Sequence, residues 1–211
     1  MAVRRSAASP LALAVLALLS ERSMHPYEIA SEMRVRGIEH SIRLNYGSLY
    51  SVVDALRDAG YITAQETVRE GKRPERTIYA VTEEGYAELR ERLRSLLGRH
   101  DREYPRFMAG LAFLEHVPRD EAVELLQQRT RELDQEIGHL RAIVTGLREH
   151  GLERIAIVEA EYLLTLWDAE AAWVRELTDD LATGRLAPMD KPTAWPRREA
   201  PTNPEAKETA R

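Results

Sequence analysis

Residues 45–60 read NYGSLYSVVDALRDAG and predict a short helix with one buried face. Its apolar residues recur at helical spacing and are Leu49, Val52, Val53 and Leu56. Asn45 suits the N-cap position, where its side chain accepts a hydrogen bond from a free amide of the first turn, and Gly60 suits the helix end. The polar residues between the apolar positions are therefore left on the opposite face.

Two further short helices are predicted upstream. The first runs from about Pro10 to Ser20, because Ser9 is a good N-cap and proline is favoured at the first helical position. The second runs from about Pro26 to Arg36 and is followed by Gly37, a residue that suits a helix end. Three short helices joined by tight connections are typical of a helix-turn-helix.

After Gly60 the apolar period changes from helical to alternating. One strand is predicted from Ile62, Ala64 and Val68, and a second from Ile78 and Ala80. The polar residues 69–76 between them predict a hairpin with a basic tip. A fourth helix is then predicted after Thr82, with an inward face formed by Tyr86, Leu89, Leu93 and Leu96. This order of elements is that of a winged helix-turn-helix.

The second half of the chain predicts long helices with a heptad pattern. A first helix carries apolar residues at the a and d positions over four heptads. Its seam is the predicted dimerisation interface, formed by Val123, Leu126, Leu133, Ile137, Leu140, Val144 and Leu147, with Thr130 at one a position. A second helix over residues 153–182 repeats Ala160, Trp167, Val174 and Leu181 at intervals of seven. The two seams pair within one subunit or across a dimer, and the pattern leaves both arrangements open.

These patterns divide the chain into four segments. We expect residues 1–8 to be a flexible N-terminus, residues 9–98 a winged-helix DNA-binding domain and residues 99–186 a helical dimerisation domain. Five of the ten prolines lie within residues 187–211, which predicts a disordered, proline-rich tail. The expected fold class is mainly α: an N-terminal winged helix-turn-helix, with three helices and a two-stranded wing, followed by a helical, coiled-coil-like dimerisation domain.

The net charge of −5 is unevenly distributed along the chain. Residues 1–82 carry 11 Lys and Arg against 9 Asp and Glu, whereas the remaining residues carry 19 against 26. The N-terminal part is therefore net positive and is the better partner for a polyanion. Together with the winged helix-turn-helix order of elements, this charge distribution favours double-stranded DNA as the partner.

The sequence argues against an enzyme and against a metal protein. It contains no cysteine, and its six histidines include no pair at the helical spacing of two metal ligands. It also lacks a GxxxxGK phosphate loop, a GxSxG nucleophile motif and an HExxH zinc motif. We therefore expect no catalytic residue, no metal and no cofactor.

The apolar run Leu11–Leu19 follows Arg4 and Arg5 and so imitates a signal sequence. It is too short to span a bilayer, which needs about 20 apolar residues, and no small-residue cleavage site follows it. We interpret it as a buried first helix, and we expect a cytoplasmic protein without membrane contact.

Polar residues gather at the start of the helix that follows Asn45. In a winged helix-turn-helix this helix enters the major groove and the wing lies against the backbone or minor groove. A helix N-terminus favours phosphate, and hydroxyl, amide and guanidinium groups bind phosphates or base edges. The expected DNA-binding residues are Arg43, Asn45, Tyr46, Gly47, Ser48, Tyr50, Ser51 and Arg57, with Lys72, Arg73 and Arg76 on the wing. Each alone is explained as well by capping or solvation, and their convergence on one module favours DNA.

A protein-interaction adaptor is the alternative function. Winged helices and heptad seams both serve in adaptors that bind no specific DNA, and the chain as a whole is acidic. The basic residues at the wing favour DNA over this alternative.

Several motifs resemble those of the PadR family. The segment Tyr46–Tyr50 resembles its G-S-L-Y recognition helix, and Tyr79, Thr82 and Gly85 resemble its Y-x-x-T-x-x-G wing exit. Residues 25–29, HPYEI, are similar to the start of the family's second helix, and residues 107–181 look like the long helical dimerisation domain of its larger subfamily. Pro26, Asp54 and Arg57 depart from the residues common at those positions, which leaves the operator sequence open.

This resemblance implies an intertwined homodimer that binds an inverted-repeat operator and represses a nearby gene. It also implies release from DNA when a small hydrophobic or phenolic effector occupies the dimer cavity. The candidate effector-binding residues are the aromatic residues of the helical half, Tyr104, Phe107, Tyr162, Trp167 and Trp173, for which core and seam packing is the alternative role.

Overall fold

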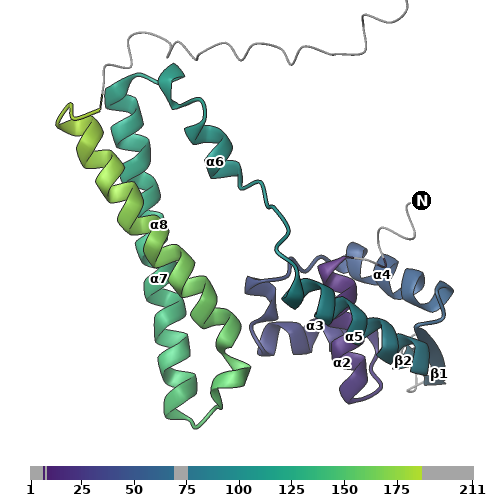
Figure 1. The fold of residues 1–211 in the computed structure, drawn as a ribbon. Helices are drawn as coiled ribbons and strands as arrows, with labels where there is room; N and C mark the ends of the chain where they lie inside the picture. Colours follow the sequence, from purple (N-terminus) through teal and green to yellow (C-terminus); the bar gives the residue numbers. More distant parts are fainter. Residues whose placement is uncertain (1–6, 8, 69–75, 187–211) are drawn as a thin grey trace, which may run out of the picture. The chain divides into compact units, whose positions relative to one another are not determined.

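The computed structural model of the chain describes residue 7 and residues 9–68 and 76–186. It divides into two compact units, residues 1–102 and residues 103–211. The first unit combines short helices with a β-hairpin, and the second is built on a pair of long helices (Figure 1). The expected mainly α fold, a winged helix-turn-helix followed by long helices, is confirmed.

The first unit contains the predicted helices and strands in the predicted order. Its helices are α2 (Pro10–Glu21), α3 (Pro26–Val35), α4 (Tyr46–Asp58) and α5 (Glu83–Gly98), with a 3-10 turn η1 (Ile38–His40) between α3 and α4. Its two antiparallel strands are β1 (Ile62–Val68) and β2 (Arg76–Val81). The register places Ile62 opposite Val81, and it shifts between Ala64 and Glu66.

Side chains at the helix starts fix where each helix begins. The Ser9 hydroxyl accepts a hydrogen bond from the Ala12 amide at 3.2 Å at the start of α2. His25 and Glu28 form a reciprocal capping box at the start of α3. Since such caps satisfy amides that have no partner within the helix, these boundaries follow from the sequence.

The wing is joined to α5 by a compact turn around Thr82. The Thr82 hydroxyl donates to the Gly60 carbonyl at 2.7 Å and accepts from the Gly85 amide at 3.1 Å. The backbone passes so close here that an ideal Cβ on Gly85 would lie 2.0 Å from the Tyr61 carbonyl oxygen. Only glycine fits at position 85 without a shift of the backbone.

Helix α2 is the centre of the core of the first unit. It contacts α3, α4, α5 and β2. The fully buried large side chains of α2 and of the elements around it are Val15, Leu16, Leu18, Leu19, Met24, Ile29, Met33, Leu49, Val52, Val53 and Leu56. All four residues of the apolar stripe predicted on α4 are among them.

Helix α5 departs from the prediction in its last turns. Leu89 is buried, and the Tyr86 hydroxyl donates to the Ser20 carbonyl at 3.1 Å, so both point inward as predicted. The prediction was wrong for Leu93 and Leu96, which are 39% and 61% exposed in the chain. The helical period continues to the end of α5, but the core of the unit stops one to two turns earlier.

The N-terminal segment 1–8, which we expected to be flexible, contains one described residue. Ala7 is helical and buried, and its carbonyl accepts a hydrogen bond from the half-buried guanidinium of Arg92 on α5. The rest of that segment and the expected tail at residues 187–211 lie outside the described residues.

The second unit is dominated by two long helices. Its elements are α6 (Arg106–Leu111), η2 (Leu114–His116), α7 (Arg119–Glu149), η3 (Arg154–Ala156) and α8 (Val158–Ala182). Ion pairs join α7 to α8 along their length, at Arg141–Asp168 (2.7 Å), Arg148–Glu161 (2.6 Å), Arg129–Glu170 and Arg175–Asp134. From Asp134 through Arg141 to Arg148 on α7, the partners on α8 run back from Arg175 through Asp168 to Glu161, so the two helices are antiparallel.

The heptad seam of α7 faces α8 of the same chain. Leu126, Ile137, Leu140 and Val144 are buried, and Val123 and Leu133 are half-buried. Val174 and Leu181 of α8 pack in the cluster that contains Leu126, and Trp167 packs against the cluster that contains Leu140. Leu147 remains 39% exposed. The buried seam positions are therefore paired within the subunit.

The close approach at Gly85 predicts a strong effect of one added methyl group. Gly85→Ala is expected to lower the free energy of unfolding by about 1–3 kcal/mol, because the Tyr61 carbonyl has to move. Gly98→Ala is the control, since no atom lies within 4 Å of a Cβ at Gly98 in the last turn of the same helix. Urea unfolding followed by circular dichroism measures both, and equal stability of the two variants would contradict the packing at Gly85.

Candidate DNA-binding surface

The first turn of α4 presents polar residues on a rigid base. The Asn45 side chain accepts a hydrogen bond from the Ser48 amide at 3.3 Å and so caps the helix. The predicted residues at this end are all exposed, namely Arg43, Asn45, Tyr46, Gly47, Ser48, Tyr50 and Ser51. Because the apolar stripe of α4 is buried against the core of the unit, this polar turn is held firmly and faces solvent.

Gly47 leaves the backbone of α4 accessible. An ideal Cβ at this position would lie 3.4 Å from Asn45 Oδ1, which is an ordinary contact. Internal packing therefore does not require glycine here, in contrast to Gly85. The backbone at Gly47 is exposed to solvent, so the close approach of a partner there stays a prediction.

A shallow, open hollow of about 630 Å³ lies beside this turn. It is lined by the starts of two helices and by the segment before α4: Ser9, Pro10, Leu11, Ser41, Ile42, Arg43, Asn45, Gly47, Ser48, Ser51 and Val52. The N-termini of α2 and α4 both contribute to it. Helix N-termini and an arginine together favour an anion such as a phosphate group.

Arg57 is less available for DNA than the sequence predicted. Its guanidinium lies 3.1 Å from a carboxylate oxygen of Asp54 and 3.1 Å from one of Asp58, both on the same helix. These carboxylates, first Asp58 through its hydrogen bond, raise the pKa of Arg57. The charge of Arg57 therefore mainly compensates the two carboxylates near the end of α4.

The predicted wing residues are only partly described. Lys72 and Arg73 lie outside the described residues. Arg76 begins strand β2, but its side chain also lies outside the described part of the chain. The wing cations therefore stay a prediction from the sequence.

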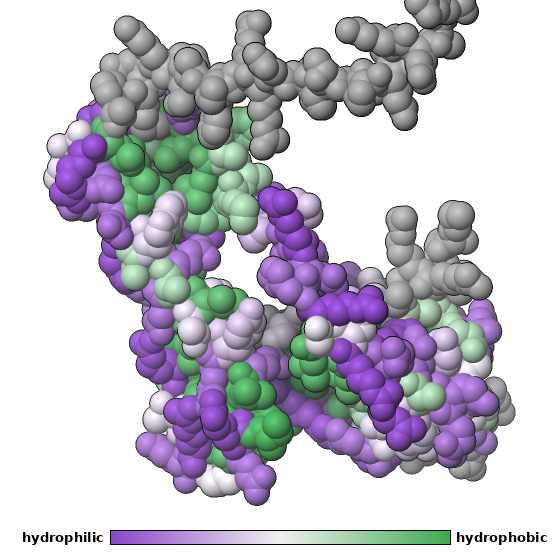
Figure 2. Space-filling model, viewed as in Figure 1, coloured by the Kyte–Doolittle hydropathy of each residue, from purple (hydrophilic) through white to green (hydrophobic). Residues whose placement is uncertain are grey.

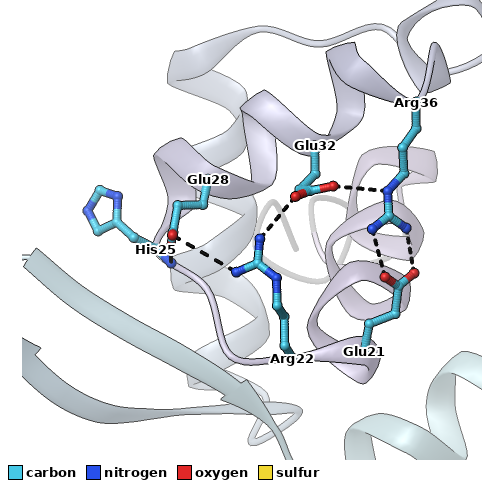
Figure 3. A network of polar contacts seen from close by, with 6 residues as sticks. All are labelled: Glu21, Arg22, His25, Glu28, Glu32 and Arg36. Carbon is cyan, nitrogen blue, oxygen red and sulfur yellow. Dashed lines mark hydrogen bonds and ion pairs between the residues drawn. The ribbon is translucent and has the colours of Figure 1, made fainter.

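Two groups of charged residues on α3 were not singled out from the sequence. On one side, the Arg36 guanidinium binds Glu21 at 2.6 Å and Glu32 at 3.0 Å, and Arg22 binds Glu32 at 3.0 Å (Figure 3). The hydrogen bond from Arg36 lowers the pKa of Glu21. This network joins the end of α2 to α3 and neutralises the acidic side chains there.

Arg34 forms the second group, together with the first residue of α4. Its guanidinium carbon lies 5.0 Å from the centroid of the Tyr46 ring. The sequence offered one indication that Arg34 lies on an exposed face: Tyr27 and Arg34 are seven residues apart and so share one face of the helix. The contact with Tyr46 crosses between helices, so periodicity alone does not reveal it.

The candidate effector residues do not form one site in the second unit. Phe107 contacts Trp173 edge to face, with ring centroids 6.5 Å apart, and the Arg129 guanidinium lies 3.7 Å from the Phe107 centroid. Trp167 packs with a different apolar cluster. Tyr104 and Tyr162 are 77% and 67% exposed. Among these candidates, the structure brings Phe107 and Trp173 into ring contact.

A capped, exposed helix on a three-helix core with an adjacent hairpin is the winged helix-turn-helix fold, a class in which many members bind DNA. Within this class, residues 15–91 match the model of the transcriptional regulator PadR-like family. These residues form a PadR-like domain, which confirms the resemblance seen in the sequence motifs.

Solved structures share the fold over most of the chain. Bacillus subtilis PadR in complex with operator DNA is 20% identical, with a TM-score of 0.66 over 80% of this chain and 97% of that one. Bacillus subtilis PadR in complex with p-coumaric acid is 18% identical, with a TM-score of 0.63 over 81% and 97%. The Vibrio cholerae virulence activator AphA is 18% identical, with a TM-score of 0.67 over 82% and 99%. At these identities the likeness establishes the fold.

The search of curated proteins found no match to this chain. Within the described residues, no helix is both long enough and apolar enough to cross a membrane.

The capping role of Asn45 predicts that stability depends on a hydrogen-bond acceptor at this position and not on the charge of the side chain. Asn45→Ala is expected to lower the free energy of unfolding by about 0.5–2 kcal/mol, because the Ser48 amide loses its partner. Asn45→Asp keeps an acceptor at the cap and is expected to unfold like the unchanged protein. Thermal and urea unfolding test both variants, and an Asn45→Ala variant of unchanged stability would show that the cap contributes nothing.

Proposed function

We propose that this protein is a transcriptional regulator that binds an inverted-repeat operator as a homodimer and represses a nearby gene in the cytoplasm. The observation that carries the proposal is the exposed polar first turn of α4 on a buried apolar stripe. Tyr46, Ser48 and Tyr50 would face base edges and phosphates in the major groove. The flanking DNA backbone would be bound by the wing residues Lys72, Arg73 and Arg76. The proposed function includes no catalytic step.

The proposed sense of regulation and the proposed effector draw on the named neighbours and on the resemblance to PadR. The name of one structural neighbour describes an activator, whereas the resemblance to PadR implies a repressor. A bound p-coumaric acid is named for Bacillus subtilis PadR, which supports a small aromatic effector here. The edge-to-face pair of Phe107 and Trp173, with Arg129 against the ring, is the site we propose for it.

We propose that the homodimer forms through the outer face of α8. This helix carries a second apolar stripe, opposite the one that faces α7, at Val158, Tyr162, Leu166, Ala169 and Trp173. Four of these side chains are between 46% and 67% exposed in the chain. The space-filling view also shows apolar surface near both ends of the α7–α8 pair (Figure 2). An inverted-repeat operator requires two copies related by a two-fold axis, and aromatic residues such as Tyr162 and Trp173 are enriched at interfaces.

Removal of one side chain from the polar turn tests the DNA proposal. Tyr50→Ala is expected to abolish selective binding to the duplex upstream of the protein's own gene, because Tyr50 is 48% exposed on the groove-facing side. Fluorescence anisotropy across a range of salt concentrations measures it, with a scrambled duplex for comparison. Leu97→Ala is the control, since Leu97 is 85% exposed at the end of α5.

Two results would contradict the DNA proposal. If Tyr50→Ala bound DNA as the unchanged protein does, the DNA-contacting surface would not be the first turn of α4. Absence of binding by the unchanged protein at low salt would favour the protein-interaction adaptor, because ionic contacts to phosphate are strongest there.

Introducing charged residues on the outer face of α8 tests whether this face forms the dimer interface. The variant with Tyr162→Asp and Leu166→Asp is expected to be monomeric and to bind the operator more weakly, because a charge buried in an apolar interface is costly. Light scattering gives the mass, and anisotropy gives the affinity. Leu125→Asp is the matched control, since Leu125 is 51% exposed on α7. A double variant that stays dimeric would place the interface elsewhere.

A further inference from the structure

Helix α3 exposes two polar faces of different character. Glu28, Glu32 and Arg36 lie on one face, where Glu21 and Arg22 complete the ion-pair network (Figure 3). Tyr27, Ser31 and Arg34 lie on the other face, because residues four and seven apart share one side of a helix. The carboxylates of α3 are therefore directed away from Arg34 and already have cationic partners.

Arg34 is held at the start of α4 by the Tyr46 ring. The guanidinium lies over this ring at 5.0 Å from its centroid, a distance typical of a cation–π contact. The guanidinium has more N–H donors than its contacts with Tyr46 and Glu39 use, so donors remain for oxygen acceptors. A hydrogen bond with the Tyr46 side chain raises the pKa of Arg34, so its charge is retained.

One carboxylate competes for this guanidinium. A Glu39 carboxylate oxygen lies 3.9 Å from the Arg34 Nε, and both side chains are nearly half exposed, at 43% and 46%. Such a long, solvated ion pair contributes little to stability. It is readily exchanged for a stronger anion.

We infer that Arg34 binds a backbone phosphate of the DNA that α4 contacts, so that the DNA-binding surface extends from α4 onto α3. This inference rests on the proposed function. In a helix-turn-helix the first helix of the pair crosses the DNA backbone while the second enters the groove. The planar guanidinium matches two phosphate oxygens, and the Tyr46 ring orients it beside the groove-facing turn.

Two variants with opposite expected effects on DNA affinity test the inference in the full-length protein. Arg34→Gln is expected to weaken binding several-fold, equally for the upstream duplex and for a scrambled duplex, because a phosphate carries no sequence information. The slope of log affinity against log salt should become less steep by about 0.9, the value for one lost phosphate contact. Glu39→Gln is expected to strengthen binding to both duplexes, since it removes the competing carboxylate.

The control is Arg94→Gln, which changes the net charge by the same amount on α5, where Arg94 is 73% exposed. It is expected to leave the affinity and the salt slope unchanged. Unchanged affinity and slope for Arg34→Gln, with loss of binding by Tyr50→Ala, would overturn the role of Arg34 and leave the proposed function intact. No binding of either duplex by the unchanged protein would overturn both.

Discussion

Burial of helix α2 around most of its circumference, with only the face of Leu13, Ala17 and Ser20 half-buried, is the constraint on which the first unit depends. Neighbouring positions such as Val15 and Leu16 point in different directions, yet both are fully buried. A helix that is apolar on most of its faces needs packing partners on most of them, and α3, α4, α5 and β2 supply them. Helix α4 therefore turns its apolar stripe toward α2 and its polar first turn toward solvent. The surface that would bind DNA is thus fixed by the hydrophobic core beneath it.

Much of this fold could be predicted from local signals in the sequence. Ser9, Asn45 and Thr82 each mark a helix start because their side chains satisfy amides there, and all three make the expected hydrogen bonds. The apolar period identified the buried face of α4 correctly. The same period failed for Leu93 and Leu96 on α5, since a repeat shows which side of a helix is apolar but not where its neighbour ends.

The contacts between helices could not be predicted in the same way. A heptad seam fits a partner from the same chain as well as one from another chain, and only the three-dimensional structure shows that Leu140 and Val144 face α8 of their own subunit. The consequence is a helix α8 with apolar residues on two faces, of which α7 covers one. Arg34 was missed for the same reason, because its contact with Tyr46 joins two helices.

Local ion pairs explain how an acidic chain presents a surface suited to DNA. The carboxylates of Glu21 and Glu32 are bound by arginines of the first unit, and Asp54 and Asp58 are bound by Arg57. Exposed pairs of this kind add at most about 1 kcal/mol each to stability, so their larger effect is on the local field. Charges separated by more than about 8 Å are screened at physiological salt. A phosphate near α4 would therefore respond to Arg34, Arg43 and the helix N-terminus rather than to the net charge of the chain.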